Sequence, residues 1–453
     1  MAQTCLTRRA LLAYAAFALP LAMAALPVYV HAPKFYAQGQ GVPLATVGAI
    51  LLACRLLDAL QDPLFGWFSD RTARSTLGRR ALILAGLPLL AAGFVALFHP
   101  PQAGTPGSEM WLAGSLVVVY LGFSLSSISY YALGAELSDD YNERTRVTAT
   151  RGALAVTGVL VAAALPEWLS GRVGELSALG LFSWMFVPVL LLASWATVAG
   201  SPRPAHAPRE FATRTRDESA GATSSLYRAL IEPLSSRRYR WLIAVSMLSG
   251  IAAAIPGTLI LFYVQDVLQR PDLSGLFLAL YFLCAALGMP LWIEASRRFG
   301  KKRAWLAGML LSVAAFVWAF GLGAGDVIAF GCVCVLSGLA YGAELALPPS
   351  ILADIVDGGA HQGAQRPHGA YFGVWQMLDK LNLALAAGFA LPLLQWLGYV
   401  PGTAQAALGA LSCIYALAPC LIKIAAAACL WAAPLDLRVA ATDLVSPSGG
   451  TAS

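Results

Sequence analysis

Twelve long apolar segments separated by short polar loops dominate this chain. A helix needs about 20 apolar residues to cross a bilayer core of roughly 30 Å, and each segment reaches approximately that length. Membrane-barrel strands alternate in polarity over about 10 residues, whereas these segments are apolar throughout. Charged residues make up 12% of the chain, against roughly 25% in soluble proteins. We therefore predict an all-α membrane protein with transmembrane helices at 10–30, 46–68, 81–98, 110–135, 148–169, 176–199, 241–264, 273–293, 304–322, 327–347, 370–397 and 404–433.

The distribution of Lys and Arg over the loops predicts the orientation. If the N-terminus is cytoplasmic, the inside segments carry 23 basic residues and the outside segments carry only Lys34, Arg172 and Arg270. Cytoplasmic loops of membrane proteins carry such an excess. We therefore expect a multi-pass protein of the plasma (inner) membrane with both termini in the cytoplasm. The same bias explains the net charge of +6 without a nucleic-acid partner.

The longest polar segment, 201–240, divides the spans six and six. Its Pro, Arg, Ser and Ala residues are typical of a flexible linker. We divide the chain into an N-terminal six-helix bundle (1–200), a cytoplasmic linker (201–240), a C-terminal six-helix bundle (241–433) and a cytoplasmic tail (434–453).

The two halves share short motifs. Spans 2 and 8 run into basic loops that contain Gly, SDRTARSTLGRR and EASRRFGKKR, and spans 4 and 10 end in the acidic runs YYALGAELSDD and PPSILADIVD. Two parallel six-helix repeats with a solute site between them at mid-membrane form the major facilitator fold. The chain resembles that architecture.

Span 2 carries three ionisable residues within eight positions: Arg55, Asp58 and Asp62. Asp58 and Asp62 differ by only about 40° around a helix of 3.6 residues per turn. Such residues are costly inside a membrane and are usually functional. Two carboxylates one turn apart disfavour double ionisation, so either one is protonated or a cation lies between them. This pattern predicts a coupling site for H⁺ or Na⁺; in the alternative interpretation, Arg55 neutralises one Asp and the stripe only stabilises the bundle.

A polar stripe on span 4 contains Tyr120, Ser124, Ser127 and Tyr131, which share one helix face. These hydroxyls either line a cavity or hydrogen-bond neighbouring helices. We assign the two tyrosines to the solute site.

Each half also carries a buried cation, Arg151 in span 5 and Lys380 in span 11. Gln376 lies one turn before Lys380 on the same face, and Trp375 shares the face of Asp379. We predict that Arg151, Lys380, Gln376 and Trp375 bind the solute between the halves; alternatively, each cation pairs with a carboxylate of the bundle.

Three motifs, RLLDALQDPLFGWFSDRT, YYALGAELSDDYNERTRVTATR and ILADIVD, resemble those of the glycoside–pentoside–hexuronide:cation symporters. The resemblance implies that Asp58 and Asp62 bind Na⁺, Li⁺ or H⁺ with help from the Ser124 hydroxyl. On this basis we assign Asp58, Asp62, Ser124 and Ser127 to the cation site. It implies that Arg151 contacts the sugar and that Lys380 lies near both sites. It further implies that Arg144 closes the cytoplasmic side against acidic residues of the other half. We assign gating to Arg55, Arg144, Asp354 and Asp357.

Two departures from the family pattern leave the identity of the solute undetermined. Residues 10–30 contain no Asp or Glu where the family has a sugar-binding acid, and Ser127 replaces another acid on span 4. Carboxylates make strong charge-assisted hydrogen bonds to sugar hydroxyls. We therefore expect cation-coupled symport of a sugar, a glycoside or a related small solute, with a lysolipid or an organic anion as the alternative. A membrane sensor without transport is a further alternative.

The sequence contains no pattern that supports catalysis. Metal-ligand clusters, nucleophile–base arrangements and phosphate loops are missing from it. We therefore do not expect an enzyme, a metal or a cofactor beyond the coupling ion. The expected partners are the solute, the coupling cation and the lipid bilayer, and we expect a monomer.

Overall fold

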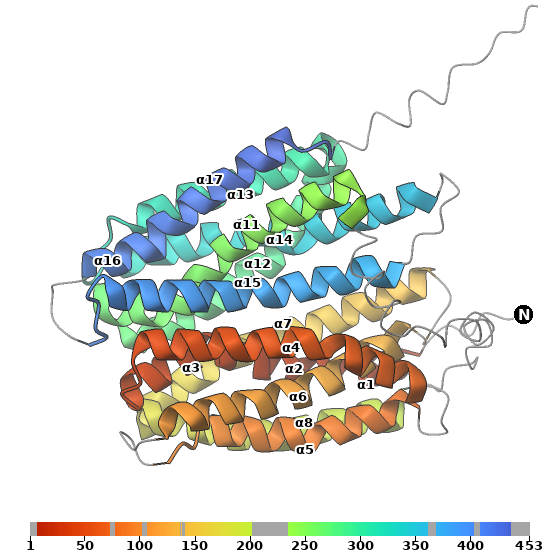
Figure 1. The fold of residues 1–453 in the computed structure, drawn as a ribbon, viewed down its shortest axis with the longest axis horizontal. Coiled ribbons are helices and arrows are strands. Elements are labelled where there is room, and N and C mark those ends of the chain that lie inside the picture. Colours follow the sequence, from red (N-terminus) through yellow and green to blue (C-terminus); the bar gives the residue numbers. More distant parts are fainter. Residues whose placement is uncertain are drawn as a thin grey trace, which may run out of the picture.

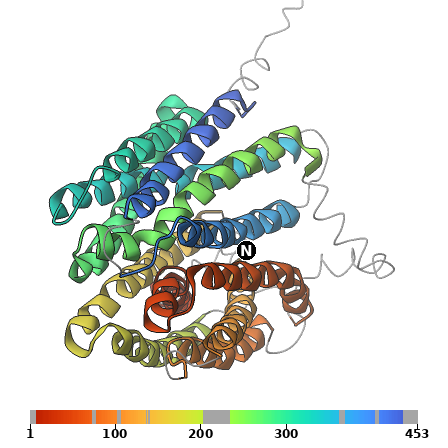
Figure 2. The ribbon, with the colours of Figure 1, turned by 60° about the vertical axis from the view of Figure 1, so that its left-hand side comes forward.

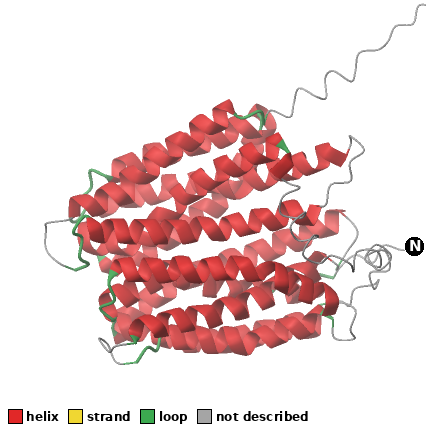
Figure 3. Ribbon diagram, viewed as in Figure 1, coloured by secondary structure: helices red, strands yellow, loops and turns green. Residues whose placement is uncertain are grey.

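A computed structural model describes residues 7–72, 78–101, 107–135, 137, 141–201, 234–360, 368–402 and 408–435. Within the helices, the side chains of 63–64, 66–72, 135, 141–145, 148–149, 356–360, 368–370, 372–373 and 376 lie outside that description. The described chain forms helices and loops (Figure 3). Twelve of its helical segments are long and apolar enough to cross a membrane, which confirms the predicted all-α fold with twelve spans.

The first half contains six spanning segments. The first is interrupted and consists of α1 (Arg8–Ala15), α2 (Ala18–Leu26), η1 (Pro27–His31), α3 (Ala32–Lys34) and η2 (Phe35–Gly39). The other five are α4 (Leu44–Thr72), α5 (Arg79–Leu97), α6 (Ser108–Ala135), α7 (Tyr141–Val173) and α8 (Glu175–Gly200). Pro27 and Pro33 lie at the first turns of η1 and α3, and proline removes a backbone donor from the helical ladder. This explains why the first span changes helical geometry at these points.

The second half repeats this arrangement. It contains α11 (Arg237–Phe262) with η3 (Tyr263–Val267), η4 (Pro271–Leu273), α12 (Ser274–Phe299), α13 (Lys301–Ala319), α14 (Val327–Ala360), α15 (His368–Trp396), α16 (Leu408–Ser412), η5 (Cys413–Leu417) and α17 (Ala418–Ala432). Spans 1 and 7, which correspond in the two halves, both end in a π-helical turn.

Two helices extend well beyond their predicted apolar spans. The fifth span is predicted at 148–169, but α7 covers Tyr141–Val173. The tenth is predicted at 327–347, but α14 continues to Ala360 through Pro348 and Pro349. Apolarity reports only the part of a helix that lies in the hydrocarbon core, whereas backbone hydrogen bonding continues into the polar region. Hydropathy therefore could not predict the polar ends of these two helices.

The two halves lie side by side as separate helix bundles (Figures 1 and 2). Between them, α4 packs along α15, α7 packs along α12, and the first span contacts α11. Since spans 2 and 5 of one half meet spans 11 and 8 of the other, the interface follows the internal repeat. The mid-membrane interface is thus built mainly from α4, α7, α12 and α15.

We call the side of the bundle that carries the 39–44 loop the Gly39 end, and the opposite side the Arg8 end. The halves are tightly joined at the Gly39 end, where the Ala45 backbone N–H donates to Gln395 Oε1 at 2.7 Å. A Cβ at Gly48 would lie 2.8 Å from the Ala387 carbonyl oxygen and 2.9 Å from a Pro392 side-chain atom. Backbone therefore approaches backbone directly between α4 and α15.

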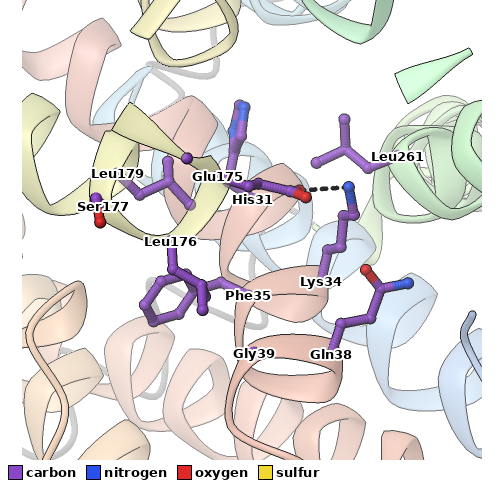
Figure 4. Close-up of a pocket in the computed structure, with 11 residues that line it drawn as sticks. His31, Lys34, Phe35, Gln38, Gly39, Glu175, Leu176, Ser177, Leu179 and Leu261 are labelled. Atoms are coloured by element: carbon purple, nitrogen blue, oxygen red, sulfur yellow. Dashed lines mark hydrogen bonds and ion pairs between the residues drawn. The ribbon is translucent and has the colours of Figure 1, made fainter. Parts of the chain in front are cut away.

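A cavity of about 390 Å³ lies at this same end (Figure 4). Buried Lys34 forms an ion pair with Glu175 of α8 across it, and Leu261 of α11 also lines it. Side chains from both halves thus enclose this cavity.

Large apolar side chains cover the outside of the bundles. Leu192 and Trp195 of α8 are 67% and 70% exposed, and Trp431 of α17 is 73% exposed. Such surfaces are stable only against lipid. Together with the twelve spans, they make the chain a multi-pass membrane protein.

Replacing Gly48 with Leu is expected to lower the free energy of unfolding by about 1–3 kcal/mol, because the added side chain overpacks the α4–α15 contact. The measurement is the unfolding midpoint in detergent, with Gly114→Leu as control. A Cβ at Gly114 meets nothing within 4 Å. Equal midpoints for the two variants would contradict the close approach of the halves.

Candidate functional site

Asp58 is the centre of a charged cluster in the middle of the first bundle. Its side chain is 1% exposed, and its Oδ1 accepts hydrogen bonds from Ser124 Oγ of α6 at 2.7 Å and from Gln61 Nε2 at 3.4 Å. Its Oδ2 lies 3.3 Å from Arg55 Nη1. A buried carboxylate requires such partners, because water is excluded. The Asp58 carboxylate therefore finds its partners on α4 itself and on α6.

Lys380 of α15 enters this cluster from the other half. Its ammonium nitrogen lies 3.1 Å from Asp58 Oδ2 and 2.5 Å from Asp62 Oδ2. It also donates to Ser124 Oγ at 3.0 Å. One lysine thus bridges the carboxylates of span 2 and joins the two bundles.

Arg55 completes the cluster. Its guanidinium carbon lies 4.4 Å from the centre of the Tyr120 ring, a cation–π contact. Tyr120 is 4% exposed and so belongs to the environment of the cation cluster. Ser127, a further predicted cation ligand, is buried on α6. The formal charges of Arg55, Asp58, Asp62 and Lys380 sum to zero, which explains how the membrane interior tolerates them.

The arrangement can also hold a small cation. Carboxylate and hydroxyl oxygens of Asp58, Asp62 and Ser124 converge on the Lys380 ammonium. Asp62 Oδ1 is buried and has no hydrogen-bond partner within the described chain. Oxygen atoms of this kind are the ligands that hard cations prefer. The sequence predicted the stripe formed by Arg55, Asp58 and Asp62; that Lys380 lies within it became visible only in the tertiary structure.

A larger cavity, of about 430 Å³, lies beside the cluster, mainly in the second bundle. It is lined mainly by α11, α12, α14 and α15, and Tyr29 and Val30 of the first span line it from the other half. Its surface is rich in aromatic rings, among them Trp375, Tyr281 and Tyr341. Small-molecule sites are typically apolar cavities of this size with a few placed polar groups.

Only part of the predicted solute set lines this cavity. Trp375 does, and Asp379, which shares its helix face, does as well. Lys380 instead contacts the carboxylates, about 100° around α15. Arg151 lies over the exposed Tyr131 ring at 4.7 Å and does not line the cavity. The Gln376 side chain lies outside the described residues. The solute roles of Arg151, Lys380 and the two tyrosines stay predictions.

The predicted gating residues are only partly described. Asp354 pairs with Lys301 of its own half, with Nζ 2.6 Å from Oδ2. The side chains of Arg144 and Asp357 lie outside the description. Arg55 lies in the charged cluster beside Asp58. A closing contact between the halves through these residues stays a prediction.

Sequence reasoning missed one buried ion pair. Glu344 of α14 lies 2.9 Å from Lys423 of α17, and Ser249 of α11 hydrogen-bonds both. Lys423 had no evident partner in the sequence. The signal that could have found its partner was present, because Glu344 is an ionisable residue within the apolar span 327–347.

A family model described as MFS/sugar transport protein matches residues 11–437. The chain belongs to this family. The protein is therefore a secondary transporter with the major facilitator fold. The predicted resemblance to cation symporters is confirmed at the level of the family.

Individual proteins show the same relationship. The symporter YjmB of Bacillus subtilis is 25% identical over 393 residues, which cover 83% of this chain and 81% of that protein. The sodium-dependent lysophosphatidylcholine symporter 1 of Gallus gallus is 23% identical and covers 77% of this chain and 71% of that protein. The structure of a bacterial homologue of the human lysosomal transporter Spinster matches with a TM-score of 0.67 at 17% identity. It covers 95% of this chain and 97% of that one, and shows the shared fold.

Replacing Lys380 with Met in this MFS/sugar transport family member is expected to cost about 3–5 kcal/mol of stability, because two buried carboxylates lose their shared cation. Adding Asp62→Asn removes one of those charges. The double variant is therefore expected to lose less stability than the two single variants added together. Denaturant unfolding in detergent measures this cycle. Additive losses would show that the two side chains do not interact.

Proposed function

We propose that this protein is a cation-coupled symporter for a sugar or a related small solute, with H⁺ or Na⁺ as the coupling ion. The observation that carries the proposal is the carboxylate pair of α4, bridged by Lys380 of α15. A charged cluster that joins two moving halves at mid-membrane is where ion binding can act on alternating access. Membership of the MFS/sugar transport family supports the solute class.

The charge balance of the cluster suggests how the ion acts. A Na⁺ ion at Asp58 and Asp62 adds a positive charge beside the Lys380 ammonium, and the two cations repel each other strongly in a low dielectric. A proton on Asp62 weakens the same contact by removing a negative charge. Either ion therefore loosens the hold of α4 on α15. We infer that this is the step that links ion binding to movement of the halves.

We assign the Arg8 end to the cytoplasm, with both termini on that side. The excess of 23 basic residues over three supports this orientation. The Gly39 end then faces outward, and the packing of Gly48 and the pairing of Ala45 with Gln395 close that side. The structure would thus represent a state closed to the outside.

A lysolipid is the second candidate solute. The similarity to the chicken sodium-dependent lysophosphatidylcholine symporter favours it. A thermal-shift comparison of the purified protein with neutral sugars, organic anions and lysophosphatidylcholine, each with Na⁺, Li⁺ or low pH, separates the candidates. Stabilisation by lysophosphatidylcholine alone would replace the sugar in the proposal.

Asp58→Asn is expected to abolish uptake driven by an imposed Na⁺ or H⁺ gradient, because the cluster loses its central negative charge. The measurement is solute accumulation in proteoliposomes. Glu294→Gln is the matched control, because Glu294 is exposed and pairs with Arg298 near the Arg8 end of α12. Accumulation by Asp58→Asn at the level of the control would refute the coupling role.

A further inference from the structure

Glu344, Ser249 and Lys423 form a closed triangle of hydrogen bonds in the second bundle. Ser249 Oγ donates to Glu344 Oε1 at 2.6 Å, Lys423 Nζ donates to Ser249 Oγ at 2.8 Å, and Lys423 Nζ lies 2.9 Å from Glu344 Oε1. Lys423 is only 4% exposed, and its third bond goes to the Ser249 carbonyl oxygen. These charge-assisted bonds satisfy the buried Lys423 ammonium and one oxygen of Glu344.

The same three chemical groups occur in the coupling cluster of the first bundle. There, Ser124 donates to Asp58 at 2.7 Å, and Lys380 contacts Ser124 at 3.0 Å and Asp58 at 3.1 Å. The two triangles differ in their surroundings. A second carboxylate, Asp62, stands beside the first triangle, whereas the second borders the 430 Å³ cavity through Glu344. The second triangle therefore has access to a solute.

One oxygen of Glu344 remains available to such a solute. The contacts from Ser249 and from Lys423 both use Oε1, so Oε2 accepts no hydrogen bond from the described part of the chain. Lys423 is not itself among the residues that line the cavity. We read Lys423 as a positioning residue, which fixes the charge and the orientation of Glu344 from behind.

Two polar side chains of α15 face the same cavity. Asp379 is exposed there and forms no ion pair with a described residue. Asn382 is 6% exposed, and its Oδ1 is buried without a hydrogen-bond partner among the described residues. The amide packs against Gly250, where a Cβ would lie 2.0 Å from Nδ2, and Gly250 also lines the cavity. An unpaired buried acceptor costs about 1–3 kcal/mol, which a hydroxyl donor from a ligand would recover.

We propose that Glu344, Asp379 and Asn382 form the hydroxyl-recognition site for a neutral polyhydroxylated solute, bound among the aromatic rings of the second bundle. This inference rests on the proposed symport function and places its solute site. It also accounts for the absence, on spans 1 and 4, of the acidic residues that bind sugar in the resembled family. The carboxylates that accept hydrogen bonds from the solute are supplied by α14 and α15 instead.

The lining discriminates against other solutes. Glu344 is balanced by Lys423, but Asp379 leaves a negative charge at the cavity, and no Lys or Arg is among the lining residues. An organic anion would be repelled. The quaternary ammonium group of choline could stack on Tyr and Trp rings, but that group donates no hydrogen bond, and choline offers one hydroxyl where several acceptors line the cavity. A sugar offers several hydroxyl donors together with an apolar face for Trp375.

The test is equilibrium binding to the purified full-length protein, without an ion gradient. The probes are xylose, methyl β-D-glucoside and methyl α-D-galactoside as neutral sugars, glucuronate as an anion, and choline as a quaternary ammonium. We expect at least one neutral sugar to bind, and Asp379→Asn and Asn382→Ala each to weaken that binding by about tenfold or more, as a hydrogen bond to a charged or buried group requires. Glu294→Gln, at the exposed end of α12, is the control and is expected to bind normally.

Glu344 needs a paired design, because Glu344→Gln alone strands the buried Lys423 ammonium. Glu344→Gln combined with Lys423→Met removes both charges and is expected to fold and to weaken sugar binding. Unchanged sugar affinity in Asp379→Asn and Asn382→Ala would overturn the proposal, and so would binding of glucuronate or choline without any neutral sugar, or of none of the probes. The coupling function fails on a different result, gradient-driven uptake by Asp58→Asn, so the two failures are distinguishable.

Discussion

The contact of the Lys380 ammonium with Asp58 and Asp62 is the interaction on which the rest of this structure depends. Without it, Asp62 and Lys380 would lose their ion-pair partners among the described residues, and Asp58 would keep only Arg55. Removing one partner of a buried ion pair is strongly destabilising. The contact also joins α4 of one bundle to α15 of the other. The same three side chains therefore offset one another's charge and hold the two bundles together.

Helix α15 contributes side chains both to the charged cluster and to the larger cavity. Lys380 points to the coupling cluster, and Asp379, about 100° around the helix, faces the cavity. Both side chains are fixed to one rigid element, so a shift of α15 caused at one site must move the other. Under the proposed function, this geometry would couple the two sites, because an ion at the cluster and a solute in the cavity would both bias the position of α15.

The repetition of the carboxylate–hydroxyl–ammonium triangle in the second bundle shows a general solution to a common problem. A carboxylate that must remain charged in a low-dielectric environment needs a cation and a neutral donor nearby. In the first bundle, a second carboxylate, Asp62, stands beside the triangle and contacts the same lysine. In the second, Lys423 is enclosed, and the surface that remains accessible belongs to Glu344. Similar groups therefore support different roles because their neighbours differ.

The sequence by itself determined the twelve spans and the charged stripe of span 2, because hydropathy and helical period are local properties of the chain. The same period correctly placed Asp379 with Trp375 and apart from Lys380. Contacts between distant helices were decided only by the tertiary structure. The position of Lys380 between the two aspartates, which leaves its solute role a prediction, is one such contact, and the pairing of Lys423 with Glu344, 79 residues away in the chain, is another. Which buried charges meet depends on how helices cross and rotate against one another, and no local pattern records those angles.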